Sequence, residues 1–170
     1  FCLPGGKIAV YTGILPVVKN EAALAVVIGH EVAHAVARHG GERISQAMTV
    51  EVIEELLAQG LSRASPAIRT GALQAFGLGS QVGAILPYSR THEIEADQIG
   101  LMYAAKAGYD PREAVPLWER MEAVGRSRPP EFLSTHPREK RRIERLEKHM
   151  PAAIEAYEAA PQRYGLGETW

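Results

Sequence analysis

Cysteine is almost absent from this chain of 170 residues, which has a single thiol, that of Cys2. One cysteine excludes any disulfide within the chain, and it leaves the redox compartment of the protein open. We expect Cys2 to act as a small buried hydrophobic residue and not as a reactive thiol.

An excess of charge of one sign is also missing, since 19 lysines and arginines nearly balance 20 acidic residues and leave a net charge of −1. The chain therefore has no electrostatic signature of nucleic-acid binding. Internal repeats and low-complexity tracts are absent too. The length and the 46% content of hydrophobic residues predict one globular domain over residues 1–160 and a tail over residues 161–170.

The chain begins at Phe1 and not at a methionine, and no charged segment followed by an apolar run opens it as in a signal peptide. We expect the sequence to be a processed protein or a fragment of a longer one. The missing leader therefore says nothing about a signal, lipid anchor or membrane helix upstream.

A pair of histidines four residues apart, His30 and His34, lies within an apolar stretch. We predict that this stretch is one buried helix, which begins after Asn20 and ends at residues 40–41, both glycine. Histidines at this spacing share a helical face about 6 Å apart, so their imidazole nitrogens can bind one zinc ion. Glu31 lies about 100° round the helix, where a carboxylate reaches a water on the metal without being a ligand.

A second predicted helix offers the third protein ligand that zinc needs. It follows Pro87 and ends near Ala107, before Gly108. Glu93 and Asp97 are four residues apart on one face of this helix. That spacing lets Glu93 bind the metal while Asp97 accepts a hydrogen bond from the far nitrogen of a ligating histidine.

These two helices, the opening segment 1–6 (Phe-Cys-Leu-Pro-Gly-Gly) and the segment 134–137 (Ser-Thr-His-Pro) resemble the M48 family of zinc metallopeptidases. The resemblance covers roughly residues 1–150 and is strongest to the soluble or peripheral Oma1-like bacterial members. It implies a zincin-like (gluzincin) domain that is mainly α-helical with a small β-sheet, an α+β fold, and that holds one Zn²⁺. It also implies that His30, His34 and Glu93 are the zinc ligands, that Glu31 is the general base, and that Asp97 supports the ligands from outside.

The activity implied by the resemblance is that of a zinc metalloendopeptidase, in which zinc activates a water and Glu31 carries its proton to the leaving amine. We expect unfolded, misfolded or membrane-associated proteins as substrates, a role in protein quality control, and a location in the bacterial cell envelope, periplasmic or membrane-associated. Oligomeric state and cleavage specificity stay open.

His136 is the candidate for a second catalytic residue, because it precedes a predicted helix and its ring can turn toward the zinc. We expect it to donate a hydrogen bond to the tetrahedral oxyanion. A fourth zinc ligand in a resting form and a solvent-facing histidine at a helix cap are the alternatives. Arg142, on the same helix, is a weaker candidate for anchoring a carboxylate. The other histidines, His39, His92 and His149, are expected to have no part in the site.

A proteolytically latent binding or chaperone-like module that keeps zinc for stability is the alternative function, and a closed site with His136 as fourth ligand would suit it. Glu31 argues against it, because a structural site has no use for a base beside its ligands. Loss of zinc unfolds a domain that the metal holds together but leaves a catalytic domain largely folded.

The segment 70–89 has no charged residue, and four glycines with Gln74, Ser80 and Gln81 interrupt its apolar side chains. We expect it to be buried or to form a lid near the active site. Contact with a membrane surface and a membrane span are the lesser alternatives.

The rest of the chain is predicted to be mostly helical. The pattern predicts a strand over 7–11, which pairs with an extended substrate or forms a plain hairpin, and an extended segment over 14–18. It predicts an amphipathic helix over 42–59 that packs into the core. Three more helices are predicted: one from Asp110 to Gly125, a charged, solvated one from Pro137 to His149, and a short last one from Pro151.

Overall fold

The computed structural model describes residues 1–3, 5–125 and 142–167. The chain divides into two compact units, one of residues 1–37 with 93–170 and one of residues 38–92.

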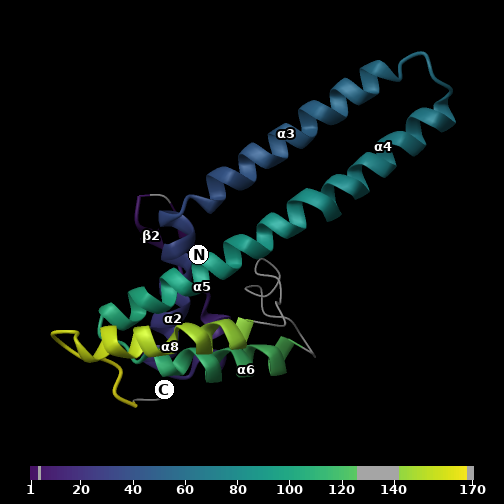
Figure 1. The fold of residues 1–170 in the computed structure, drawn as a ribbon. Coiled ribbons are helices and arrows are strands. Elements are labelled where there is room, and N and C mark those ends of the chain that lie inside the picture. The colour runs from purple at the N-terminus through teal and green to yellow at the C-terminus, as the bar shows by residue number, and fades with distance from the viewer. Residues whose placement is uncertain (4, 126–141, 168–170) are drawn as a thin grey trace. The chain divides into compact units, whose positions relative to one another are not determined.

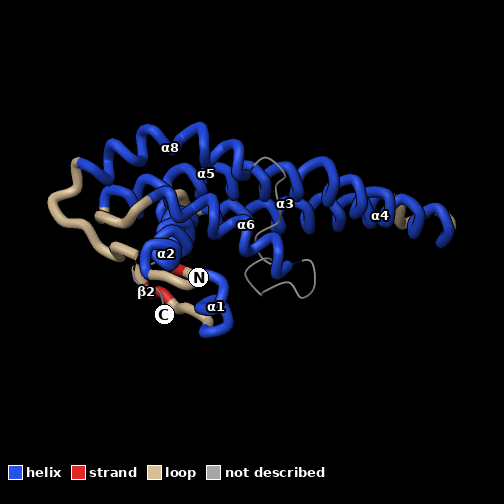
Figure 2. Tube along the Cα trace, turned by 90° about the horizontal axis from the view of Figure 1, so that it is seen from below, coloured by secondary structure: helices blue, strands red, loops and turns tan. Residues whose placement is uncertain are grey.

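The first unit is mainly helical and carries a small sheet, as predicted (Figure 1). Strands β1 (Cys2–Leu3) and β2 (Lys7–Ile8) are antiparallel, with Cys2 opposite Ile8. The helical elements that follow are a 3₁₀ turn (Thr12–Ile14), α1 (Leu15–Val18), α2 (Glu21–Val36), the part of α5 (Leu86–Lys106) from Glu93 onward, a 3₁₀ turn (Pro111–Glu113), α6 (Ala114–Gly125) and α8 (Arg142–Glu158). Figure 2 shows the two strands beside α1 and α2.

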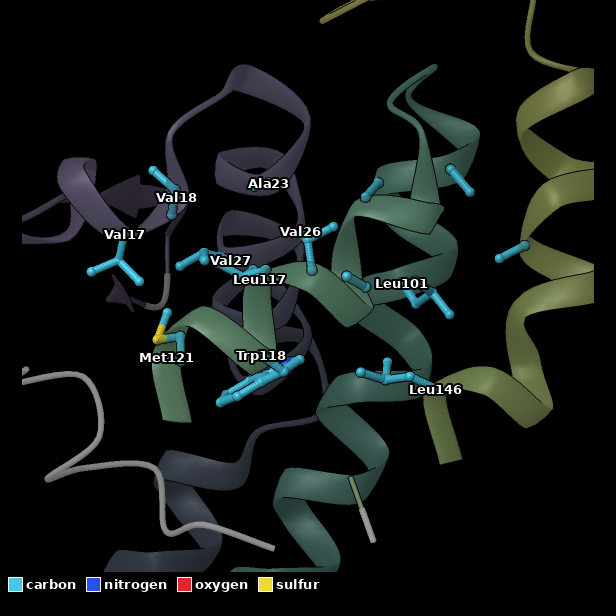
Figure 3. Close-up of a cluster of buried hydrophobic side chains, with 14 of the residues drawn as sticks. Val17, Val18, Ala23, Val26, Val27, Leu101, Leu117, Trp118, Met121 and Leu146 are labelled. Atoms are coloured by element: carbon cyan, nitrogen blue, oxygen red, sulfur yellow. The ribbon is translucent and has the colours of Figure 1, made fainter. Parts of the chain in front are cut away.

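The core of this unit is formed where α1, α2, α5, α6 and α8 meet (Figure 3). Leu101, Leu117 and Met121 are at most 1% exposed. Val17 and Val18 reach the same core from α1. The prediction of an extended segment over 14–18 is therefore wrong: Pro16 occupies the first turn of a short helix, where its missing N–H costs nothing.

The predicted start of α2 is confirmed, because the side chain of Asn20 accepts a hydrogen bond of 2.7 Å from the backbone N–H of Ala23. Its predicted end is wrong. The helix ends at Val36, Arg38 adopts a left-handed conformation with φ +60°, and residues 40–41 lie in the first turn of the next helix. The chain turns at a residue with a side chain, and the two glycines do not end α2.

Other boundaries follow the sequence more closely. Gly108, with φ +88°, lies two residues after the end of α5. Asp110 caps the turn before α6, and Gly125 ends that helix. The predicted break at Pro151 is wrong, because α8 continues through it. Leu146, Ala153 and Tyr157 are buried along α8, and this burial offsets the backbone hydrogen bond that the proline lacks.

The second unit contains α3 (His39–Gly60), α4 (Pro66–Ser80) and a π-helical segment (Gln81–Ile85), which leads into α5. α3 and α4 run antiparallel side by side in Figures 1 and 2. His39 is the buried residue of α3, and none of the described side chains of α4 and the π segment is buried. The predictions of core packing for 42–59 and of burial for 70–89 are therefore wrong.

The exposed side chains of α3 include a row at every fourth position: Ile44, Met48, Val52 and Leu56, each between 55 and 64% exposed. Apolar periodicity predicted the helix, but it does not say whether another element covers the apolar face. No helix in the described part of the chain is both long and apolar enough to cross a membrane.

Candidate metal centre

The site depends on a close approach of α2 and α5 at two glycines. A Cβ atom added to Gly29 would lie 2.5 Å from the carbonyl oxygen of Gly100, and one added to Gly100 would lie 2.5 Å from the backbone nitrogen of His30. Only glycine allows two helix backbones to come so near. The contact sets His30 directly against α5. This contact was not predicted from the sequence, although a glycine inside a helical pattern is a signal for close packing.

Three side chains converge where these helices meet. His30 Nε2 lies 3.1 Å from His34 Nε2 and 3.4 Å from Glu93 Oε2, and His34 Nε2 lies 3.3 Å from Glu93 Oε1. Among the residues described, this is the group of histidine, cysteine and acidic side chains whose donor atoms come close enough to hold a metal ion. The structure thus brings together the three residues that the sequence singled out as ligands.

The donor atoms fit a zinc ion in kind and in spacing. Two imidazole nitrogens and a carboxylate are a ligand set that zinc uses with one position left open. In a tetrahedral site with bonds of about 2.0–2.1 Å, neighbouring donors lie about 3.3 Å apart. The observed separations of 3.1 to 3.4 Å, which run from the two histidines to different oxygens of Glu93, are close to that spacing.

Asp97 lies on the far side of the His30 ring. Its Oδ1 is 3.0 Å from His30 Nδ1, one turn of α5 beyond Glu93. A hydrogen bond there assigns the proton to Nδ1 and leaves the lone pair of Nε2 directed toward His34 and Glu93. The two carboxylates on one face of α5 therefore contact the two ends of the same imidazole.

Glu31 follows His30 on α2 and is 8% exposed. Its side chain is therefore largely buried, one position after the first histidine in the sequence. His136 lies outside the described residues, so its predicted role has no structural counterpart here.

Arg142 lies closer to the metal site than its charged segment predicts. The helix that contains it was predicted to be solvated, but Arg142 is only 4% exposed. Its Nη2 donates a hydrogen bond of 2.6 Å to Asp97 Oδ1, and its guanidinium carbon lies 3.6 Å from the centre of the Trp118 ring. In a run of mixed charges, the pattern alone did not indicate that Arg142 is buried.

The remaining histidines are outside the three-residue group. His39 was expected near the end of the helix that carries His30 and His34, but it is the first residue of α3. Within the second unit its ring stacks on that of His92 with centres 4.2 Å apart, and His92 Nε2 lies 2.7 Å from Glu42 Oε2. His149 contacts Gln98 on α5.

Comparison with known proteins agrees with this geometry. The sequence model of peptidase family M48 matches residues 1–150. The chain is 45% identical to the mitochondrial metalloendopeptidase OMA1 of Schizosaccharomyces pombe over 157 residues, which cover 90% of the chain and 44% of that protein. It is 35% identical to human metalloendopeptidase OMA1, with 93% of the chain and 31% of the relative covered. It is 30% identical to the beta-barrel assembly-enhancing protease of Yersinia pestis, with 81% and 29% covered.

The chain thus spans less than half the length of these relatives. No solved structure matches it at a significant level. The match over residues 1–150 shows that the chain belongs to peptidase family M48.

Proposed function

We propose that this chain is the catalytic domain of a zinc metalloendopeptidase. The observation that carries the proposal is the convergence of His30, His34 and Glu93, together with the burial of Glu31, which follows His30 in the sequence. These three residues would hold the ion. Zinc bound there would supply Lewis acidity to the scissile carbonyl group and to the attacking water.

Three other residues would transfer the proton, orient a ligand and bind the oxyanion. Glu31 would accept the proton of the attacking water and deliver it to the nitrogen of the leaving amine. Asp97 would keep the proton of His30 on Nδ1, 3.0 Å away. We retain His136 as the proposed donor of a hydrogen bond to the oxyanion.

The substrates we propose are unfolded or misfolded proteins, in keeping with a role in protein quality control. The relatives are named as a metalloendopeptidase and as a protease that enhances β-barrel assembly, which supports protein substrates. The bacterial relative also supports a location in the cell envelope. The short strand β2, whose residues are exposed, would pair with the backbone of an extended substrate and so favour broad specificity. Contact of residues 70–89 with a membrane surface stays a prediction.

Cleavage of an unfolded protein tests this function. The zinc-loaded chain should cut a reduced, unfolded substrate, lose this activity in a chelator and regain it when zinc is added back. His34→Gln should be inactive, because it removes a ligand but leaves Glu31 in place. Cleavage that persists in the chelator and in His34→Gln would contradict the proposal.

A further inference from the structure

The Arg142 guanidinium joins three elements around the metal centre. It reaches from α8 to both oxygens of Asp97 on α5, with Nη2 at 2.6 Å from Oδ1 and Nε at 2.5 Å from Oδ2. The same Nη2 lies 3.5 Å from Glu93 Oε2 and 3.2 Å from His30 Nδ1. One cation therefore contacts the carboxylates of Glu93 and Asp97 and approaches the first histidine of α2.

The arrangement around Asp97 Oδ1 is specific. This oxygen lies within hydrogen-bond distance of both His30 Nδ1, at 3.0 Å, and Arg142 Nη2, at 2.6 Å. Both nitrogens are donors when the proton of His30 is on Nδ1, so the carboxylate oxygen accepts from the two of them. The planar guanidinium also contacts the second oxygen, since Nε forms an ion pair with Oδ2, and the single ammonium of lysine cannot reproduce this geometry.

Burial of these two charges costs desolvation free energy. A buried ion pair is weak evidence for stability, because desolvation of the two charges opposes their attraction. Arg142 is 4% exposed and Asp97 is 8% exposed, and Trp118 covers one face of the guanidinium. The pair is thus shielded from water, with the Trp118 ring against the guanidinium.

We propose that Arg142 is a positioning residue for the metal site, which acts on the ion through Asp97 and His30. The guanidinium fixes the Asp97 carboxylate and offsets its repulsion from Glu93, one turn away on α5. Asp97 in turn fixes the His30 ring with Nε2 toward the other two donors. This inference rests on the proposed zinc site. It gives α8, which supplies none of the three proposed ligands, a part in metal binding.

Zinc affinity, measured by competition with a chromogenic chelator, tests the role directly. Arg142→Gln should lower the affinity by about 10–100-fold, the range typical of residues that support metal ligands. Arg142→Lys keeps the charge but loses the planar guanidinium, so its zinc affinity should lie between those of wild type and Arg142→Gln. Lys148→Gln is the matched control, since it removes an exposed cation from the same helix and should leave affinity unchanged.

A double substitution separates action through Asp97 from a direct effect. Asp97→Asn should weaken zinc binding by itself, and adding Arg142→Gln should lower affinity by no more than about twofold further, because residues that act as one unit are not additive. Additive losses would show that Arg142 acts by another route and would overturn the proposal. So would an Arg142→Gln chain that is less stable but binds zinc as tightly as wild type.

The outcome also distinguishes this inference from the proposed function. A wild-type chain that binds no zinc would overturn both. Normal binding by wild type and by Arg142→Gln would overturn only the role of Arg142. Where Arg142→Gln does not give the wild-type circular dichroism spectrum, Arg142→Lys decides, and unchanged affinity in it would count against the proposal.

Discussion

Gly29 of α2 and Gly100 of α5 meet backbone to backbone, and the space between them has no room for a methyl group. The contact lies one residue from His30 and three residues from Asp97, so it determines how near the two ligand-bearing helices come. Helix packing without a side chain between the backbones brings His30 of α2 within 3.4 Å of Glu93 of α5.

Gly100→Ala should therefore lower the free energy of unfolding by about 1–3 kcal/mol, the cost of overpacking a buried contact, and weaken zinc binding as the helices separate. Gly71→Ala is the control, because a Cβ on Gly71 would meet nothing within 4 Å. It should stabilise the exposed helix α4 by up to about 1 kcal/mol. Equal or greater stability of Gly100→Ala in chemical denaturation would contradict the account of the contact.

Removal of zinc should leave the fold largely intact. The core around Leu101, Leu117 and Met121 is built without any of the three donor residues. A chelator should therefore abolish cleavage while the helical circular dichroism signal is kept, with a lower melting temperature, since a ligand that binds only the folded state stabilises it. Loss of the helical signal on chelation would instead favour a structural zinc module.

Two leucines with opposite surroundings should respond differently to truncation. Leu117 is 1% exposed and Leu56 is 62% exposed. Leu117→Ala should cost about 2–5 kcal/mol, from lost burial and the cavity left behind. Leu56→Ala should change the free energy of unfolding by less than about 0.5 kcal/mol. A large loss for Leu56→Ala would mean that something covers the row of apolar side chains on α3.

The cap before α6 should make stability depend on pH. Burial by itself would raise the pKa of Asp110, but the hydrogen bonds and the charge of Arg112 outweigh it and hold this pKa below its usual value. A carboxyl with a lowered pKa contributes stability above its unfolded value of about 3.9, and this contribution is lost as pH falls through the folded pKa.

Asp110→Ala should cost about 0.5–2 kcal/mol at pH 7, because it removes the acceptor for the Arg112 N–H as well as the charge. Asp110→Asn keeps a capping side chain and should cost less. The difference between wild type and Asp110→Asn in urea denaturation should shrink below about pH 4. A difference that stays constant from pH 7 to pH 3 would show that the charge contributes nothing.

The sequence predicted those parts of the site that depend on spacing within one helix. His30 and His34 share a face of α2, and Glu93 and Asp97 share a face of α5, because residues four apart do so in any helix. The end of α2 was not predictable, since a left-handed Arg38 is a less common way to end a helix than a glycine.

The sequence pattern did not predict contacts between elements that are far apart in the chain. Arg142 reads like the charged residues around it, and only packing of α8 against α5 and α6 buries it. Likewise, the apolar residues of α3 predicted a core helix, whereas the structure leaves them exposed. Periodicity fixes a helix and its faces, and the presence of a covering partner depends on the tertiary fold.

The most direct test of the account is cleavage of an unfolded protein by the zinc-loaded wild type and by zinc-loaded Glu31→Gln, with zinc content measured for both. The account predicts that both chains hold one zinc and that only wild type cleaves, with the variant slower by at least about 100-fold. Equal cleavage by the two chains would contradict the role of Glu31 as general base and the assignment of this site as the catalytic centre.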